Sequence, residues 1–277
     1  MKYAIYNSAA GAAEHHGDYW REVNFNDHLK LTGHQTTFQY FIKNYPPPRE
    51  VLDAGCGLGR WILPLAEMGY KAYGIEKEPE AVAYLQKNYS GQNVEIIEGD
   101  AFRMPYRDKS FDVVFSLGVV EHFRDREAQV RLLKEHSRIL KEDGTLLLTV
   151  PYASLLRIFV HIPALFLSRL YMRARGKPGR WGFTEYRYSK GEIKRIVMAS
   201  GFTVKKIIYD ELLPPYNFGL TFDWPFFKLM TKKEGSFLLN KFGRFFFNVL
   251  WNIYPGTISS GIGLVCQHQK KHQRSVR

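Results

Sequence analysis

Short apolar runs alternate with longer amphipathic stretches over the first half of the chain. The apolar runs predict strands at Glu50–Asp53, Lys71–Ile75, Val94–Glu98, Val113–Leu117 and Thr145–Val150. Between them, apolar residues recur at helical spacing in Gly59–Met68, Pro79–Asn88 and Arg126–Leu140. Strands that alternate with helices are typical of a parallel sheet that is covered by helices on both faces. The pattern therefore predicts an α/β protein with a parallel, doubly wound sheet.

The segments on either side of this alternation extend the predicted domain. Residues 27–44 have helical spacing and are stopped by Pro46–Pro48. Ser189–Glu192 has the spacing of a capping box and predicts a helix that ends near Ser200. Two further apolar runs predict a sixth and a seventh strand, at Phe202–Tyr209 and Ile258–Gln267. We expect a single domain over 1–277, made of an N-terminal helical cap (1–47), a core (48–152, 184–210 and 257–269) and two hydrophobic, basic insertions (153–183 and 211–256).

The composition is that of a folded domain with an unusual charge. Of 277 residues, 45% are hydrophobic, 15% are aromatic and 13 are proline, which excludes disordered, collagen-like and disulfide-scaffold proteins. The formal net charge of +12 indicates an anionic partner. Residues 1–150 carry 18 Lys and Arg against 21 Asp and Glu, whereas residues 151–277 carry 21 against 6. The basic character therefore belongs to the second half, whose net charge is +15.

A glycine-rich turn follows the first predicted strand in Val51–Arg60, which reads Val-Leu-Asp-Ala-Gly-Cys-Gly-Leu-Gly-Arg. Gly55 and Gly57 let the backbone approach a ligand closely, and Gly59 permits close packing of strand and helix. Glycine spacing of this kind is weak evidence by itself. Position 60 is Arg where a dinucleotide-binding turn has Gly or Ala, which argues against a nicotinamide oxidoreductase.

Two acidic residues follow the next predicted strands. Glu76 comes at the end of the second strand, where a carboxylate can accept hydrogen bonds from both hydroxyls of a ribose. Asp100 follows the third strand, where a carboxylate can accept a hydrogen bond from an exocyclic amine. The alternative is that both acids only solubilise the strand ends. The fourth strand then runs into a loop within Phe111–Phe123.

This ordered set of motifs resembles the class I S-adenosylmethionine-dependent methyltransferases, in particular the small-molecule branch of ubiquinone and menaquinone biosynthesis. The resemblance covers residues 48–152 strongly and the closing strands weakly. It implies a doubly wound, Rossmann-like, seven-stranded methyltransferase sheet and S-adenosylmethionine as cofactor. It departs from the family at Glu142–Gly144, where Pro-Gly-Gly is frequent. The matching residues are Asp53–Gly59, Glu76, Gly99–Ala101 with Pro105, Phe111–Asp112 with Glu121–His122, and Leu140–Thr145.

The resemblance implies which residues meet the methionine part of the cofactor. The glycine turn, through Gly55, Cys56 and Gly57, would line it. Asp53 would help to orient its amino end, and Leu117 would lie near the sulfonium.

The resemblance also implies an adenosine site. Glu76 would bind the ribose, and Lys77 would flank the adenine. Asp100, Ala101 and Phe102 would hold the adenine edge.

Methyl transfer asks little of the protein beyond placement. The cofactor activates the methyl group, so the acceptor needs in-line positioning, worth roughly 7–11 kcal/mol, and a base if it is protonated. His122 is the candidate base because its loop leaves the fourth strand beside the cofactor. The alternative is that Glu121–His122 is a structural turn. Other candidates are Tyr19, His34 and Tyr186 as bases, and Arg21 and Arg60 as partners of the cofactor carboxylate. No metal site is expected, because no His or Cys cluster has ligand spacing.

Two stretches of the second half combine basic with large apolar residues. Residues 155–180 contain six Lys or Arg and no acidic residue, and Pro163 predicts a division into two short helices. Residues 236–254 place aromatic and aliphatic side chains around a narrow polar row. Such stretches suit a helical cap on the sheet, a lid over an apolar substrate, or contact with an anionic membrane. Because the charges lie among aliphatic side chains, the pattern argues against nucleic-acid binding.

The sequence therefore predicts methyl transfer from S-adenosylmethionine to an apolar or lipid-linked small molecule, by O-methylation through in-line displacement. Two alternatives stay open. One is a soluble small-molecule methyltransferase without membrane contact, and the other is a non-catalytic binding protein with a degenerate methyltransferase fold. The oligomeric state is not predicted.

The expected compartment follows from cysteine usage and from the N-terminal residues. Cys56 and Cys266 are the two cysteines, and the opening residues do not predict a signal peptide. The long uncharged stretch Phe245–Gln269 is interrupted by polar residues, so it does not predict a transmembrane helix. We expect a cytoplasmic protein that is peripheral at the inner face of the membrane.

Overall fold

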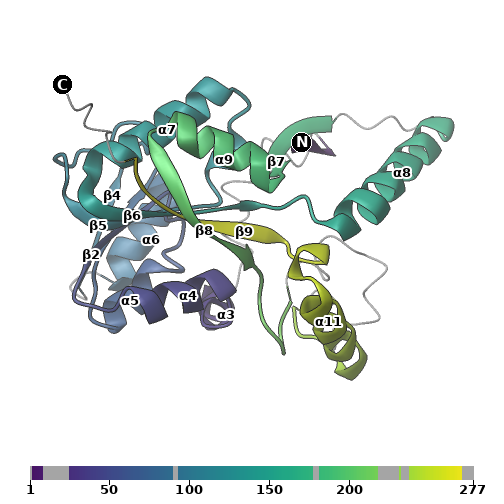
Figure 1. Ribbon diagram of the computed structural model, residues 1–277, viewed down its shortest axis with the longest axis horizontal. Coiled ribbons are helices and arrows are strands. Elements are labelled where there is room, and N and C mark those ends of the chain that lie inside the picture. Colours follow the sequence, from purple (N-terminus) through teal and green to yellow (C-terminus); the bar gives the residue numbers. More distant parts are fainter. Residues whose placement is uncertain are drawn as a thin grey trace, which may run out of the picture.

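A seven-stranded sheet forms the centre of the protein (Figure 1). The computed structural model describes residues 2–8, 25–89, 93–176, 181–217, 231 and 237–269. The strand order is β4-β3-β2-β5-β6-β9-β8, with β2 to β6 parallel and β9 antiparallel to both neighbours. The strands are β2 (Glu50–Ala54), β3 (Lys71–Glu76), β4 (Val94–Glu98), β5 (Phe111–Leu117), β6 (Leu140–Pro151), β8 (Phe202–Asp210) and β9 (Gly261–His268).

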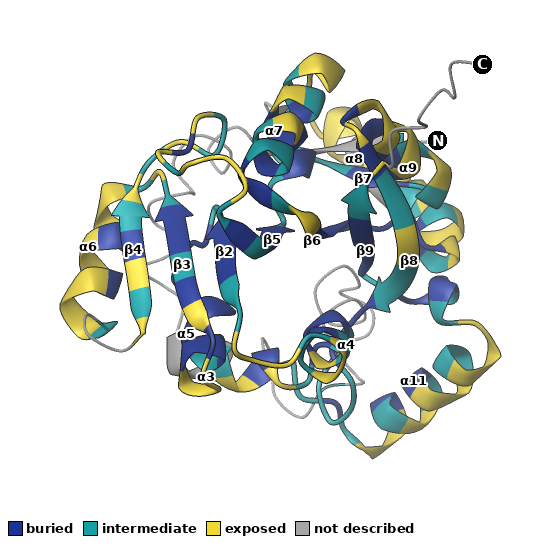
Figure 2. Cartoon of the chain, turned by 60° about the vertical axis from the view of Figure 1, so that its left-hand side comes forward, coloured by how far each residue is buried: buried dark blue, intermediate teal, exposed yellow. Residues whose placement is uncertain are grey.

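Helices cover both faces of this sheet, so the predicted doubly wound arrangement is confirmed (Figures 1 and 2). The helices are α4 (Thr36–Asn44), α5 (Ile62–Glu67) and α6 (Pro79–Tyr89) on one face, and α7 (Arg126–Ile139) and α9 (Lys190–Ala199) on the other. Val51 and Val113 of the central strands pack with α4, α5 and α6, whereas Leu52 and Val114 pack with α7 and α9. Successive strand residues point to opposite faces, which is why these buried runs supply two cores.

The N-terminal segment is only partly the helical cap that the spacing predicts. β1 (Lys2–Ser8) pairs antiparallel with β7 (Trp181–Tyr188) in a separate two-stranded sheet, which the apolar pattern does not reveal. The stretch predicted as one helix is divided into α3 (Phe25–Thr32) and α4. Thr36, at the start of α4, donates through Oγ1 to Tyr209 O at 2.7 Å, which fixes α4 to the end of β8.

A helix leads away from the sheet after β6 (Figure 1). The π-helical turn η2 (Arg157–His161) continues into α8 (Ile162–Ala174), and the backbone is helical at Leu156 and at Ile162. The predicted division at Pro163 is wrong. Pro163 lies in the first turn of α8, where a missing N–H is tolerated.

A second peripheral helix, α11 (Lys241–Ile253), leads through the turn η4 (Pro255–Thr257) into β9. Pro151 at the end of β6 pairs with Gly261 at the start of β9, so α8 and α11 leave the sheet at the same edge. No helix in the described part of the chain is long and apolar enough to cross a membrane.

Candidate functional site

The glycine turn after β2 is fixed by close approach of neighbouring strands. Gly55, Gly57 and Gly59 have φ of 88°, 54° and 74°, a region that favours glycine. A Cβ at Gly55 would lie 2.8 Å from Val119 Cγ2. Gly55 N and Cys56 N both donate to Ile75 O of β3, at 2.8 and 3.1 Å. These contacts give the turn a fixed backbone shape that requires glycine at position 55.

The helix expected directly after this turn begins later than predicted. α5 starts at Ile62, not at Gly59, so its N-terminus does not form part of the cradle. Cys56 is buried, and burial raises the pKa of its thiol well above the usual range. The Cys56 side chain packs toward β3, because a Cβ at Gly74 would lie 2.8 Å from its Sγ.

Asp53 places a buried carboxyl group beneath the glycine turn. It is 3% exposed, and among the described residues its Oδ1 has no hydrogen-bond partner. Burial raises the pKa of Asp53 to about 8, the charge of Glu76 adds to the shift, and Arg60 opposes it. A buried polar atom without a partner is uncommon in folded proteins. A cationic group would satisfy this one.

Glu76 links the turn to the end of β3. Its Oε2 accepts from Gly57 N at 2.8 Å, and its Oε1 accepts from Lys77 N at 2.7 Å and from Glu78 N at 3.1 Å. Three backbone donors thus fix the orientation of this carboxylate at the carboxyl end of the strand. Lys77 is exposed beside it.

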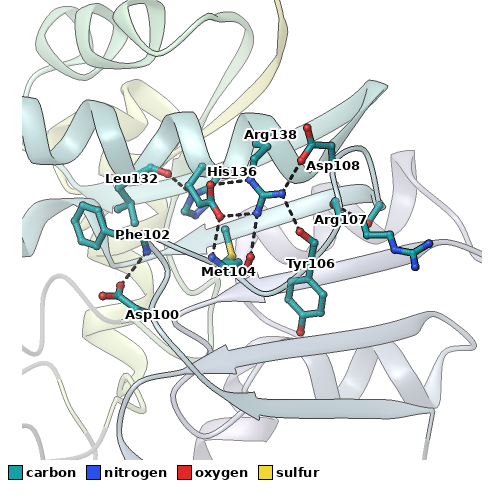
Figure 3. Close-up of polar contacts among 11 residues, drawn as sticks. Asp100, Phe102, Met104, Tyr106, Arg107, Asp108, Leu132, His136 and Arg138 are labelled. Carbon is teal, nitrogen blue, oxygen red and sulfur yellow. Dashed lines mark hydrogen bonds and ion pairs between the residues drawn. The ribbon is translucent and has the colours of Figure 1, made fainter.

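The loop after β4 presents the third predicted acid (Figure 3). Asp100 Oδ1 accepts from Phe102 N at 2.9 Å, and Asp100 O accepts from Arg103 N at 2.9 Å. Ala101 and Phe102 are half-buried, and the Phe102 ring meets Phe123 edge-on at 4.8 Å. Gly55, Glu76 and Asp100 therefore lie at the carboxyl ends of three adjacent parallel strands.

Arg138 of α7 holds this loop in place, which the sequence does not reveal (Figure 3). It donates to Met104 O at 3.0 Å and Tyr106 O at 2.8 Å, and it pairs with Asp108 at 2.7 Å and Glu135 at 2.6 Å. Glu135 in turn accepts from Met104 N at 2.8 Å, and its contact with Arg138 lowers the pKa of that carboxyl. The loop that carries Asp100 is thereby tied to the helix behind it.

A cavity of about 320 Å³ lies at the carboxyl ends of β5 and β6. Its walls include Leu117 and Gly118 after β5, Thr149–Pro151 of β6, and Arg60 after the glycine turn. Strand order reverses between β2 and β5, and ligands of doubly wound sheets bind at such a reversal. The glycine turn lies on the β2 side of this reversal, and the cavity lies on the β5 and β6 side.

The lining of the cavity mixes apolar residues with charged ones. Gln35 connects two of them, because its Oε1 accepts from Arg60 at 2.9 Å and its Nε2 donates to Asp210 at 2.8 Å. Arg157 donates to Tyr152 O at 2.9 Å and also to Ser260 O. The charged residues that line the cavity, among those described, are Arg60, Glu121, Arg157, Glu185, Arg187, Asp210 and Glu211.

Glu121 and His122 follow each other in the turn η1 (Val120–His122) and point to different places. Glu121 is 3% exposed and lines the cavity, and its Oε2 has no hydrogen-bond partner among the described residues. Burial raises the pKa of Glu121 well above its usual range, the charge of Glu185 adds to the shift, and Arg187 opposes it. His122 contacts Thr184 O through Nδ1 at 3.0 Å and does not line the cavity.

The remaining predicted candidates lie apart from this arrangement. The His34 ring meets Tyr216 edge-on at 4.8 Å, and Tyr186 contacts Phe183 at 4.9 Å. Tyr19 and Arg21 lie outside the described residues. Within the described part of the chain, no group of three or more His, Cys, Asp or Glu could hold a metal ion.

Sequence reasoning missed the residues that close the cavity from the second half. Glu185 and Arg187 alternate on β7, a period that puts them on one face of a strand. Asp210 and Glu211 follow the predicted sixth strand, just as Glu76 follows the second. Both the alternation on β7 and the position after a strand could have predicted these residues from the sequence. The position of Arg157 at the cavity could not be predicted, because it depends on the path of the chain after β6.

Residues 52–148 match the family described as "Methyltransferase domain". A "Probable S-adenosylmethionine-dependent methyltransferase" of Mycobacterium tuberculosis is 30% identical over 138 residues, 44% of this chain and 48% of that protein. A "Probable tRNA methyltransferase 9B" of Mus musculus is 30% identical over 118 residues, 40% of this chain and 23% of that protein. The chain thus spans less than half the length of these curated relatives.

A solved structure shares the fold over most of the chain. It comes from a "Complex between the Haloferax volcanii Trm112 methyltransferase activator and the putative methyltransferase", and its TM-score is 0.59. The match covers 91% of this chain and 96% of that one at 18% sequence identity.

Proposed function

Because residues 52–148 form a class I S-adenosylmethionine-dependent methyltransferase domain, we propose that the protein transfers a methyl group from S-adenosylmethionine to the polar end of an apolar or lipid-linked small molecule. The observation that carries the acceptor class is the charged cavity at the sheet edge from which two apolar helices depart. The finer resemblance to the ubiquinone and menaquinone branch stays a prediction.

The residues at the glycine turn fit this cofactor. The cofactor's ammonium group would satisfy Asp53 Oδ1, the buried oxygen that has no partner among the described residues. The backbone of Gly55, Cys56 and Gly57 would line the methionine part of the cofactor, in a turn whose positive φ at both glycines is readily adopted by glycine. The remaining contacts would be Glu76 with the ribose, Lys77 beside the adenine, Asp100, Ala101 and Phe102 at the adenine edge, and Leu117 near the sulfonium.

The sulfonium, when bound, supplies a methyl group that is already activated for displacement. The chain then has to position the acceptor and remove a proton. Glu121 lines the cavity, and its Oε2 has no hydrogen-bond partner among the described residues, so this carboxyl group can take the proton of an acceptor hydroxyl once it is ionised. His122, the base predicted from the sequence, is the rival. A contact of its Nδ1 with Thr184 O would leave Nε2 as the accepting atom.

O-methylation suits a cavity that mixes carboxyl groups with arginines. A hydroxyl can donate to a carboxylate such as Glu121 while neighbouring polar groups of the acceptor pair with Arg60, Arg157 or Arg187. The apolar remainder of the acceptor would lie outside, along α8 and α11. We propose in addition that the protein is cytoplasmic and peripheral at the inner membrane face. The two free, buried cysteines support the reducing compartment.

Transfer of a labelled methyl group from S-adenosylmethionine into three extracts tests this function. We expect label in a total lipid extract, and none above background in an aqueous metabolite extract or in tRNA. Label confined to aqueous products would favour a soluble small-molecule enzyme, and label in tRNA would favour a nucleic-acid acceptor. Absence of S-adenosylmethionine binding by calorimetry would leave a non-catalytic binding protein.

A further inference from the structure

Helix α8 exposes apolar side chains along most of its length. The exposed fractions of Phe159, Phe166, Leu167 and Leu170 are 72%, 66%, 62% and 57%. Phe159, Pro163, Phe166 and Leu170 recur at helical spacing and form one face. Arg157, which is buried at the cavity, lies on the other side of the same helical segment. Exposed apolar patches of this extent mark an interaction site.

Helix α11 carries a matching row. Phe242, Phe245, Val249 and Ile253 recur at spacings of three and four residues and are 60%, 67%, 40% and 75% exposed. The opposite side of the helix is anchored, because Phe247 is fully buried. Four apolar side chains of this helix therefore face outward while the opposite side is packed.

The two helices share a base. Phe247 of α11 lies in one apolar cluster with Leu239 and Ile258, and Leu156, which precedes the π-helical turn before α8, packs against that cluster. Arg157 donates to Ser260 O, so the cavity lies between the roots of both helices. In Figure 1 both helices occupy the end of the molecule beyond β9. We name their outward residues the two-helix surface: Leu155, Phe159, Val160, Phe166, Leu167, Leu170, Phe242, Phe245, Val249 and Ile253.

The charge around this surface is basic. Residues 153–176 and 237–269 contain no Asp or Glu. Arg173 and Arg175 are exposed in and after the last turn of α8, and Lys241 is exposed at the start of α11. A second copy of the chain would bring these cations against one another without acids to pair with. Apolar rows flanked by Arg and Lys instead match an anionic lipid surface.

We infer that the two-helix surface inserts its apolar side chains into the interface of an anionic membrane and sets the mouth of the cavity at the lipid headgroups. The inference rests on the proposed function, because the membrane contact would serve to admit the proposed methyl acceptor to the cavity. α8 is roughly 20 Å long, which is too short to cross a bilayer and suits a helix that lies at its interface.

Flotation of the full-length protein with vesicles tests the inference. We expect binding to phosphatidylcholine vesicles that contain phosphatidylglycerol, weaker binding to phosphatidylcholine alone, and loss of binding as salt rises. Phe159→Ser with Phe166→Ser, and separately Phe242→Ser with Phe245→Ser, should each weaken partitioning at least about tenfold. Met68→Ser with Met198→Ser is the matched control, because these side chains are exposed elsewhere at 46% and 56%.

Site-directed fluorescence locates the contact independently of affinity. Both natural cysteines are buried, so a polarity-sensitive label on Phe166→Cys or Phe245→Cys reports one position. We expect a blue shift with anionic vesicles at both positions and none for Met198→Cys. Unchanged spectra, unchanged flotation of the serine variants, or a dimer that these variants dissociate would overturn the inference. Vesicle binding without cofactor binding would instead contradict the proposed function and leave the surface intact.

Discussion

The cofactor region (residues 50–151) and the second half of the chain use charge differently. In the cofactor region, the carboxylate of Glu76 at the end of β3 is held by backbone N–H groups, and the carboxylate of Glu135 within α7 pairs with one arginine. In the second half, basic residues surround exposed aromatic and aliphatic side chains on two helices. The family match stops at residue 148, before these helices begin. We propose that the first region serves the chemistry common to the family and that the second selects the acceptor.

The largest expected effect is at the junction of the two regions. Glu121→Gln removes the proposed proton acceptor and should lower the rate of labelled transfer by about 10²–10⁴-fold. Because the pKa of Glu121 is raised, the wild-type rate should increase with pH as this carboxyl ionises, and the variant should lose that dependence. The opposite pattern, with the pH dependence lost only in His122→Gln, would transfer the role to His122.

Glu76→Ala should weaken S-adenosylmethionine binding by about 100-fold, since two hydrogen bonds to a charged group are lost at about 1.5 kcal/mol or more each. Calorimetry measures the affinity, and circular dichroism checks that the fold is kept. Glu80→Ala, an exposed acid at the start of α6, is the control and should bind normally. Equal affinities of the two variants would contradict the ribose assignment.

Asp53→Asn should weaken cofactor binding by about tenfold or more through loss of a buried ion pair with the ammonium group. The carboxyl is protonated below its pKa of about 8, so binding of a cation releases a proton, and the wild-type affinity should rise between pH 6 and pH 7.5. Calorimetry in two buffers of different ionisation enthalpy counts the released proton. A variant that keeps the pH dependence would exclude Asp53 as its source.

Arg138→Gln should weaken cofactor binding by about tenfold, because the loop of Asp100 loses its attachment to α7 at Met104 and Tyr106. A drop in thermal stability should accompany it. Arg131→Gln, on an exposed position of the same helix, should change neither quantity. Loss of stability without loss of affinity would reduce Arg138 to a purely structural residue.

The smallest expected effect tests whether the two-helix surface and the cofactor site act independently of each other. Phe166→Ser combined with Phe245→Ser should leave S-adenosylmethionine affinity within about twofold of the wild type, since distant sites without shared partners act independently. Isothermal titration calorimetry of the variant and the wild type, without vesicles, measures this affinity. A large loss of affinity would show that the two-helix surface supports the cofactor site, and the proposed separation of roles would fail.

Local sequence patterns predicted most strands of the sheet and the candidate cofactor residues that directly follow them. The strands β2 to β6 follow from alternating apolar runs, and Gly55, Glu76 and Asp100 follow from their position directly after strands. These features depend on residues that are close in sequence. The adjacent residues Glu121 and His122 could not be told apart in the same way, because which one faces the cavity depends on the turn between them.

Long-range contacts account for the rest. Three contacts join segments that are far apart in the sequence, and no local pattern predicts them. They are the pairing of β1 with β7, the hydrogen bonds of Arg138 to the loop after β4, and the hydrogen bond of Arg157 to Ser260 O. The division predicted at Pro163 was wrong because proline is tolerated in the first turn of a helix. α8 begins at Ile162, directly after the π-helical turn, so Pro163 lies in that first turn. The shared base of α8 and α11 likewise emerges only from the antiparallel register of β6 and β9.

Methyl transfer into membrane-embedded lipid tests the central claim most directly. Anionic vesicles prepared from a total lipid extract are incubated with labelled S-adenosylmethionine and either the wild-type protein, Glu76→Ala, or the variant that combines Phe159→Ser, Phe166→Ser, Phe242→Ser and Phe245→Ser. The account predicts label in the lipid phase for the wild type alone, and its recovery for the four-serine variant when the lipids are dispersed in detergent. Equal labelling of vesicles by the wild type and the four-serine variant, or label only in water-soluble products, would contradict it.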